Sequence, residues 1–419
     1  MQKFIILIAL FLSSVIVAQE TKISKIDSIV NSKISDNDPA LFVGIVKDGK
    51  IIYEKCRGLA SLQHHVSVDE NSVSNIASTA KQFTALMILQ LSIEEKLSLE
   101  DDIRKYLPTF YPKVKEKIKI RHLLNHTSGI RDFYDLMSIQ QNPWWRKEGL
   151  DNKDVLELLE RQQDLAFNPG SRYMYSNSGY TILAKIIAIT SGKGFHEYSK
   201  NFFENLGMKN TQFFKDYMYV IPNQALPYSD WGDGFLFTSL KDQLIFEQAV
   251  QNANHNNNRL LIESQKPIKN SEIKTYGFGL ELEDRLNRTS VHHSGGTGSY
   301  HSQMARYPIK KLTVFVMSNN SKLWSGAIAD EITNVLLPSK KATNNYNKRI
   351  NETNNLTSFS DVIGQYRSPG NYLIRIEEKD EKLFWRNGNN NPRELIQEDI
   401  NIYKMKSNPS LKVSFFKNE

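Results

Sequence analysis

The chain has 419 residues, of which 40% are hydrophobic and 24% are charged, and its formal net charge is +7. These fractions are ordinary for a globular protein, and the length allows one large domain and a smaller one. The basic residues are interleaved with acidic ones rather than gathered in a patch, so the charge predicts solvated surface and argues against a nucleic-acid partner.

The N-terminus has the pattern of a signal peptide. Lys3 precedes an apolar run that ends near Ala18, and we predict that residues 1–18 are removed on export. The run is short for a membrane span, and no second long apolar segment follows it. We therefore expect the mature protein to be periplasmic or extracellular and to have no membrane span.

The next elements predict antiparallel strands beside one buried helix. Residues 22–35 have the pattern of a helix, and two apolar runs between residues 40 and 60 flank Asp48-Gly49, a strong hairpin signal. Residues 74–91 are typical of a turn followed by a helix that is apolar nearly all round, which predicts a central position. The single cysteine, Cys56, cannot form an internal disulfide, so stability must come from a sizeable core.

Further elements follow in an order that indicates the fold class. We predict helices over residues 155–162, 181–190, 195–206, 240–250 and 325–337, and adjacent strands over residues 276–280, 290–307 and 312–318. Between them, Trp144 and Trp145 lie in an irregular stretch and either anchor the loop or line a pocket. The order predicts an α+β fold, in which an antiparallel sheet formed from both chain ends is flanked by helices and an all-helical insertion lies between them.

The composition changes near residue 338. Residues 339–358 are polar and asparagine-rich, which predicts a linker after a main domain of residues 19–338. Residues 359–419 contain short strand-like runs but are few for an independent core. We predict a small C-terminal β extension.

The predicted central helix opens with Ser78 and Lys81. Residues at positions i and i+3 of a helix lie one above the other, so the lysine can sit beside the serine oxygen, where burial lowers its pKa. A hydroxyl with an activating base, near the free N–H groups of a helix start, suits covalent acyl transfer. The pair also has ordinary explanations, because Ser-x-x-Lys occurs by chance and a serine near a helix start is often a cap.

Two further motifs accompany this pair: Tyr175-Ser176-Asn177, just before a predicted helix, and His293-Ser294-Gly295-Gly296, in a strand-like run. Local stretches at residues 76–84, 120–129 and 205–211 fit the same pattern. Together they resemble the serine β-lactamase and penicillin-binding protein superfamily, in its class C-like branch, over roughly residues 25–338. The resemblance implies a β-lactamase/transpeptidase-like fold.

The resemblance also implies roles for the motif residues. Ser78 would be the nucleophile that forms the acyl-enzyme, Lys81 would accept its proton or keep the local field positive, and Tyr175 would be the general base. Asn177 would bind the substrate, and the N–H groups of Ser78 and Gly296 would form the oxyanion hole. The remaining substrate-binding positions would be His293, Gly295 and Gly296 on the strand that edges the site.

From the residues alone, each role has an alternative. Tyr175 can be a packed aromatic, Asn177 can cap the next helix, and His293 can be structural. Three other histidines, His126, His292 and His301, are interpreted as scaffold or loop residues. Arg306 is interpreted as a surface charge, with a substrate carboxylate as its other possible contact.

His293 stands at a position where the family also uses lysine, and this departure bears on the substrate. A histidine with an unperturbed pKa is mostly neutral at pH 7, so carboxylate-bearing substrates should be held less firmly. We therefore predict an exported serine hydrolase that acts through an acyl-enzyme on an ester, amide or peptide rather than as an efficient β-lactamase. The alternatives are a D-amino-acid peptidase, carboxypeptidase or transpeptidase of cell-wall peptides, and a non-hydrolytic penicillin-binding or sensor protein.

Other chemistries find little support in the sequence. It contains no Gly-x-Ser-x-Gly elbow, no metal-spaced histidine cluster and no phosphate-cradling loop. We expect no metal and no cofactor, and a small-molecule or peptide substrate as the partner. The sequence does not determine the oligomeric state.

Overall fold

The computed structural model describes residues 20–338, apart from residues 141–151, 215–220, 227–235, 272 and 287, together with residues 362–367, 373–387, 392–399, 402–406 and 408–414. The predicted signal peptide, the pair Trp144-Trp145 and the predicted linker lie outside the described residues. The chain divides into two compact units, Met1–Leu337 and Pro338–Glu419. The domain boundaries drawn from composition, at residues 338 and 359, stay predictions.

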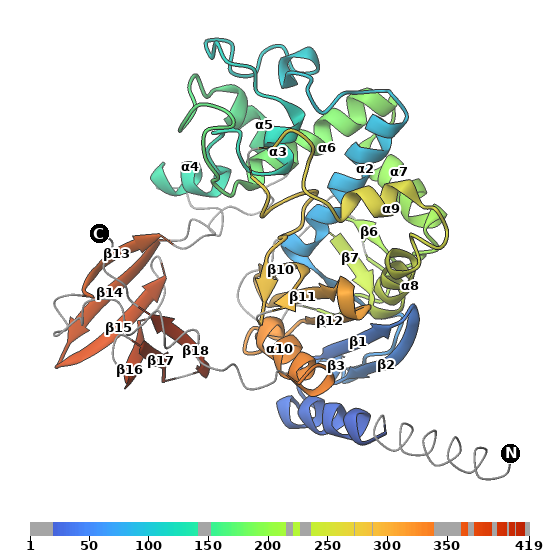
Figure 1. The fold of residues 1–419 in the computed structure, drawn as a ribbon, viewed down its shortest axis with the longest axis vertical. Coiled ribbons are helices and arrows are strands. Elements are labelled where there is room, and N and C mark those ends of the chain that lie inside the picture. Colours follow the sequence, from blue (N-terminus) through green and yellow to red (C-terminus); the bar gives the residue numbers. More distant parts are fainter. Residues whose placement is uncertain are drawn as a thin grey trace, which may run out of the picture. The chain divides into compact units, whose positions relative to one another are not determined.

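The larger unit is built on a five-stranded antiparallel sheet in the order β10-β11-β12-β1-β2 (Figure 1). Its strands are β1 (Leu41–Lys47), β2 (Lys50–Arg57), β10 (Val291–Thr297), β11 (Tyr300–Tyr307) and β12 (Leu312–Ser318). Asp48 and Gly49 form the turn between β1 and β2, as predicted, with Gly49 at a φ of 74° that suits glycine. Leu41 of β1 pairs with Ser318 of β12. The two ends of the unit thus meet inside one sheet, which confirms the predicted fold class.

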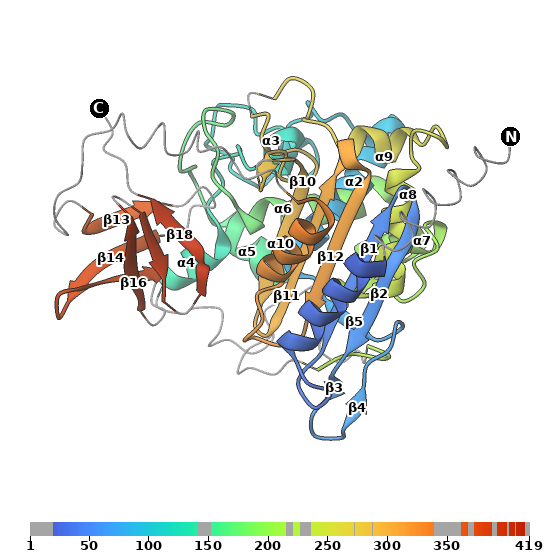
Figure 2. The same cartoon turned by 60° about the horizontal axis from the view of Figure 1, so that its bottom comes forward.

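Alternate residues of the central strands pack into two separate hydrophobic clusters, one on each face of the sheet. On one face, Leu41, Val43 and Ile45 pack in a cluster with residues of the N-terminal helix (20–33) and of α10 (Ser325–Leu336). Figure 2 shows both helices lying across this face of the sheet. On the other face, Phe42 and Val46 join the core of the helical part. Because successive side chains of a strand point to opposite faces, a sheet covered on both sides requires a continuous apolar run.

The helical part follows β2 in the chain, and α2 (Lys81–Ile93) lies at its centre. Nearly every side chain of α2 is buried, including the polar Lys81 and Gln82, as its apolar pattern predicts. The other helices are α3 (Ile120–Leu124), α4 (Phe133–Ile139), α5 (Asn152–Glu160), α6 (Asn177–Ser191), α7 (Phe195–Asn205), α8 (Leu240–Gln251) and α9 (Arg259–Ser264), with 3-10 turns η1 (Ala77–Ala80), η2 (Ile103–Lys105) and η4 (Pro308–Lys310). Among the described residues, no helix is both long enough and apolar enough to cross a bilayer.

Short strands complete the larger unit. They form the pair β3 (Leu59–Ser61) and β4 (Val66–Ser67), the set β5 (Val73–Asn75), β7 (Leu236–Ser239) and β6 (Gln212–Phe213), and the pair β8 (Asp284–Arg285) and β9 (Arg288–Thr289). The strand predicted over residues 276–280 is wrong. This run is a tight turn in which the Gly277 N–H donates to the Leu280 carbonyl at 2.9 Å and Gly279 has a φ of 71°. The glycines, not the alternating apolar residues, decide its conformation.

The smaller unit is a six-stranded antiparallel sheet in sequential order. Its strands are β13 (Gly364–Arg367), β14 (Leu373–Lys379), β15 (Lys382–Asn387), β16 (Arg393–Asp399), β17 (Ile402–Met405) and β18 (Asn408–Ser414). Its apolar cluster is small and contains Val362, Ile376, Leu383, Leu395, Tyr403 and Met405. The tail thus forms a β unit with its own core.

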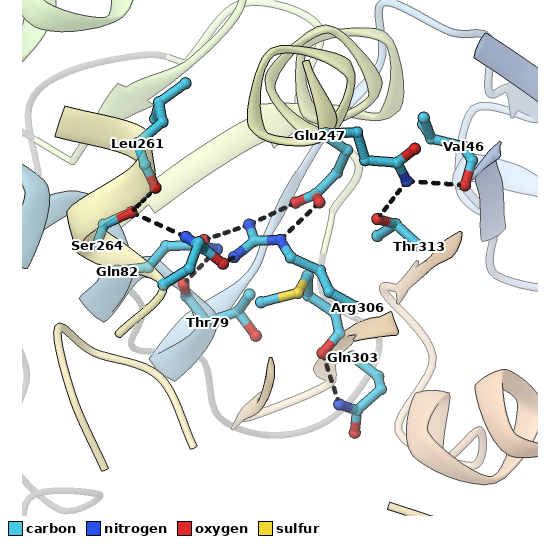
Figure 3. A network of polar contacts seen from close by, with 12 residues as sticks. Val46, Thr79, Gln82, Glu247, Leu261, Ser264, Gln303, Arg306 and Thr313 are labelled. Carbon is cyan, nitrogen blue, oxygen red and sulfur yellow. Dashed lines mark hydrogen bonds and ion pairs between the residues drawn. The ribbon is translucent and has the colours of Figure 1, made fainter. Parts of the chain in front are cut away.

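A buried ion pair joins the sheet to the helices (Figure 3). Arg306 of β11 donates through Nε and Nη2 to both carboxylate oxygens of Glu247 on α8, each at 2.7 Å, and the exposed fractions of the two side chains are 4% and 0%. Arg306 Nη2 also donates to Oε1 of Gln82 on α2 at 2.7 Å. Its Nη1 donates to Oε1 of Gln265, just after α9, at 2.9 Å. Arg306 is therefore an interior charge that ties four elements together. The interpretation as a surface charge or a substrate contact is wrong.

We expect the substitution Glu247→Gln to destabilise the protein strongly. It nearly preserves the side-chain shape but leaves the Arg306 guanidinium buried without a counter-charge, so the free energy of unfolding should fall by about 3–5 kcal/mol. Urea titration followed by circular dichroism measures the loss. The matched control is Glu263→Gln, which removes the exposed pair with Lys266 and should cost no more than about 1 kcal/mol. Equal losses in the two variants would contradict the assignment.

Candidate active site

Ser78 lies in a constrained turn between β5 and α2. The turn begins at Ala77, whose φ of 46° is uncommon for a residue with a side chain. The Ala77 N–H donates to Oδ1 of Asn75 at 2.7 Å, which helps to hold this conformation. Such backbone outliers persist where the surroundings over-determine them, often at functional sites. The result is a half-buried Ser78 hydroxyl at the start of a buried helix.

Two polar side chains contact this hydroxyl, and a third holds one of them. Nζ of Lys81 lies 2.9 Å from Ser78 Oγ, and the Tyr175 hydroxyl lies 3.0 Å from the same atom. Lys81 Nζ also donates to Oδ1 of Asn177, the first residue of α6, at 2.8 Å. The structure thus brings together two of the three predicted motifs, separated by more than 90 residues, around one oxygen.

The surroundings of Lys81 change its protonation. Its side chain is buried, and removal from water lowers the pKa of its amine to about 7, while the charge of Asp132 acts in the opposite direction. The ring faces of Tyr175 and Tyr180 lie 5.0 and 5.5 Å from Nζ. At neutral pH the amine is therefore divided between its protonated and neutral forms, and the neutral form can accept a proton.

Asp132 fixes the orientation of Asn177. Its Oδ2 accepts hydrogen bonds from the Asn177 backbone N–H and, at 2.9 Å, from Asn177 Nδ2, while its Oδ1 accepts from the Tyr134 N–H at 2.9 Å. With Nδ2 committed to Asp132, the amide oxygen of Asn177 faces Lys81. Burial raises the pKa of the Asp132 carboxyl to about 6. Asp132 is not among the residues predicted from the sequence, because a single aspartate after a loop gives no signal of its own.

Strand β10 approaches the Ser78 turn closely through Gly295. A Cβ on this residue would lie 2.2 Å from the Ile76 carbonyl oxygen and 3.0 Å from the Ser78 nitrogen, so glycine is required. Gly295 is accordingly buried, whereas Gly296, the predicted oxyanion-hole residue, is exposed. β10 is the edge strand of the sheet. The exposed Gly296 therefore lies on the outer strand of this sheet, directly after the glycine that contacts the turn of Ser78.

The side chain of His293 is turned into the protein. It is buried, its Nδ1 lies 2.6 Å from the Ser294 carbonyl oxygen, and its Nε2 lies 3.0 Å from the Tyr276 hydroxyl. A carbonyl can only accept, so Nδ1 carries the proton and Nε2 accepts from Tyr276. Burial and, secondly, the charge of Lys81 lower the pKa of His293 to about 3. His293 is thus a neutral, hydrogen-bonded part of the site wall and not an exposed substrate contact.

The turn at residues 276–280 closes the site behind Lys81. A Cβ on Gly279 would lie 2.5 Å from the Gln82 nitrogen and from the Lys81 carbonyl carbon. This contact requires glycine, and its φ of 71° favours glycine as well. The turn therefore packs directly on the backbone of α2 at Lys81 and Gln82.

Known proteins share this sequence pattern and fold. The model of the family described as Beta-lactamase matches residues 31–334. Penicillin-binding protein 4* of Bacillus subtilis (strain 168) is 29% identical over 306 residues, which cover 65% of this chain and 66% of that protein. A D-aminopeptidase of Brucella anthropi is 27% identical over 303 residues, which cover 67% of this chain and 56% of that protein. The chain thus spans less than two thirds of the length of these relatives.

A solved structure extends the likeness in fold. The octameric penicillin-binding protein homologue from Pyrococcus abyssi superposes with a TM-score of 0.67 at 23% identity, covering 95% of this chain and 96% of that chain. At this identity the likeness shows the fold. It spans almost the whole length of both chains.

We expect Asp132→Asn to slow the reaction of Ser78 with a fluorophosphonate probe by about 10–100-fold, the effect of losing a hydrogen bond to a charged group. The variant removes the anionic acceptor of Asn177 Nδ2, so the amide is free to turn its oxygen away from Lys81. It also removes the charge that raises the lysine pKa, so the midpoint of the pH–rate profile should move to lower pH. The control is Asp135→Asn, three residues further on and exposed. An Asp132→Asn variant with an unchanged rate and midpoint would contradict this role.

Proposed function

The chain belongs to the β-lactamase family, and from this premise we propose that it is an exported serine hydrolase that forms an acyl-enzyme on Ser78. The observation that carries the proposal is the position of Ser78 Oγ, within one hydrogen bond of both the Lys81 amine and the Tyr175 hydroxyl. A nucleophile with a base in reach, and the base oriented by a third group, is the arrangement that covalent catalysis needs. Asn177 is that third group.

The proposed mechanism follows from these contacts. Neutral Lys81 takes the proton of Ser78 as the oxygen attacks the substrate carbonyl, and Tyr175, which contacts the same oxygen, passes a proton to the leaving group. The N–H groups of Ser78 and Gly296 stabilise the oxyanion, and one such donor contributes about 2.7–4 kcal/mol to lowering the barrier. Water then attacks the acyl-enzyme, and the same pair transfers the protons in the reverse direction.

We propose that the preferred substrates are esters, amides or peptides that carry no free carboxylate beside the scissile bond. His293 is neutral and its ring nitrogens are engaged with Ser294 and Tyr276. Arg306 is committed to Glu247 in the interior. Neither residue that the sequence offered for holding a carboxylate supplies a free positive charge, which supports this preference.

Two alternatives remain, each with its own support. Activity on D-amino-acid peptides is favoured by the similarity to a D-aminopeptidase. A penicillin-binding protein without turnover is favoured by the similarity to penicillin-binding protein 4*, but the Lys81–Tyr175 pair counts against it, because a sensor needs no deacylating base. Export rests on the pattern of the first 18 residues.

The acylation rate should depend on pH through Lys81. Only the neutral amine can accept the serine proton, and the pKa of about 7 makes this form dominant above neutrality. The second-order rate of fluorophosphonate labelling should therefore rise about tenfold per pH unit up to pH 7 and then level off. Lys81→Arg keeps a positive charge but cannot act as a base. In this variant the rise of the labelling rate with pH should disappear, and the rate should fall by at least about 100-fold. A rate independent of pH between 5 and 9 would rule out Lys81 as the base.

A matched pair of substrates tests the preference for uncharged leaving groups. We expect a peptide amide to have a kcat/KM at least tenfold above that of the same peptide with a free carboxylate, and nitrocefin to be a poor substrate. Peptides with D and L residues distinguish the D-peptidase alternative, and Ser78→Ala should abolish every turnover. Covalent labelling by a fluorescent penicillin without any turnover would instead support the non-hydrolytic alternative.

A further inference from the structure

His126 lies against the proposed acid–base residue from three sides. Its carbonyl oxygen accepts from the Met174 N–H at 2.8 Å, and its Nδ1 accepts from the Ser176 N–H at 3.1 Å. These two residues flank Tyr175 in the chain. The imidazole ring also lies on the Tyr175 phenol, with ring centroids 4.2 Å apart and an interplanar angle of 32°. One residue therefore holds the backbone on both sides of Tyr175 and one face of its ring.

The backbone of His126 is held in an uncommon conformation. Its φ of 59° is in the left-handed region, which costs a residue with a side chain free energy unless the surroundings maintain it. The residue is almost completely buried and belongs to the loop after α3. This conformation lets the carbonyl and the ring of the same residue meet one segment, residues 174–176. The uncommon backbone conformation of His126 is thus associated with its contacts to the segment of Tyr175.

His126 cannot take part in proton transfer itself. Nδ1 accepts a hydrogen bond, so the proton resides on Nε2, and this buried nitrogen has no hydrogen-bond partner among the described residues. Burial, followed by the charge of Lys81, holds the pKa of His126 well below its usual range. The rings of Tyr173, Tyr180 and Tyr276 enclose it further. The imidazole is a neutral, fixed group whose contacts with Tyr175 are packing and backbone hydrogen bonds.

We propose that His126 is a positioning residue that fixes the Tyr175 hydroxyl at hydrogen-bond distance from Ser78, an inference that rests on the proposed function. The Tyr175 hydroxyl reaches Ser78 Oγ at 3.0 Å, and small errors at such a distance are costly, since a displacement of 1 Å can slow a reaction roughly 100-fold. The tyrosine precedes α6 in a stretch without regular secondary structure. It therefore needs a support from outside its own segment, and His126 supplies it.

Two substitutions separate the contributions of His126. His126→Asn keeps an acceptor near the position of Nδ1 and tolerates a positive φ, but it removes the ring on Tyr175. His126→Phe keeps a flat ring and removes the acceptor, which leaves the Ser176 N–H buried and unpaired. We expect both to lower kcat, by roughly 10–100-fold, with little change in KM, because the substrate does not contact His126.

The matched control is another buried histidine with the same kind of backbone contact. Nδ1 of His122 accepts from the Lys119 N–H at 3.2 Å, and His122 is 4% exposed. His122→Phe and His122→Asn should therefore lower thermal stability as much as the His126 variants do. We expect them to leave kcat unchanged, because this histidine belongs to α3 and holds that helix rather than the tyrosine segment.

A double-mutant cycle in the full-length protein tests whether His126 acts through Tyr175. In the Tyr175→Phe background, which has no hydroxyl to position, His126→Phe should slow fluorophosphonate labelling of Ser78 by less than about threefold, against roughly 10–100-fold in the wild type. Equal fold-losses in both backgrounds would overturn the proposal and make the effect of His126 a general structural one. Wild-type protein in which Ser78 does not react at all would refute the proposed function instead, so the two failures are distinguishable.

Discussion

The exclusion of water from one lysine amine is the constraint on which the rest of this structure depends. Lys81 begins a helix that is buried on nearly all sides, so its amine lies where an ammonium ion is poorly solvated. The helical core and the turn at Gly279, which lies against the backbone of Lys81 and Gln82, maintain this state. The charge of the Asp132 carboxylate acts against burial, because it raises the pKa of the Lys81 amine and keeps part of it protonated. An amine with a pKa of about 7 results from this balance between burial and charge.

The polar groups around the site form two supports that meet at the Ser78 turn. One comes from the loop after α3, where His126 and Asp132 hold the segment of Tyr175 and Asn177. The other comes from the sheet, where Arg306 holds Gln82, whose Nε2 donates to the Thr79 carbonyl at 3.2 Å. Both supports are made of buried groups whose hydrogen bonds are engaged, and such networks rigidify the residues they hold. Ser78, Lys81, Tyr175 and Asn177 are thus held both from the loop after α3 and from the sheet.

The part of the site that could be predicted from the sequence is the part set by local geometry or by a family pattern. The Ser78–Lys81 contact follows from helical spacing, because residues three apart share a face. Tyr175 and Asn177 required the family resemblance, since no local rule joins them to Ser78 and Lys81, which lie 97 and 96 residues away from them. Asp132 was missed, and His126 was interpreted only as a scaffold or loop residue, because their partners lie 45 and 50 residues along the chain, and such contacts form only when α6 packs near α3. Arg306 was misjudged for a similar reason: only its distant partner, Glu247, makes an interior position tolerable.

The joining of both chain ends in one sheet has a consequence for the synthesis of the protein. The hairpin β1–β2 is made early, directly after the N-terminal helix, yet the other edge of β1 is covered only by β12, whose residues are made near the end of the larger unit. Until then the nascent chain presents an unpaired strand edge and two apolar faces, a surface that invites association with other chains. Contacts so distant in sequence also form slowly. A chain interrupted before residue 312 would keep that edge open permanently, and we expect such fragments to require chaperones or to be degraded.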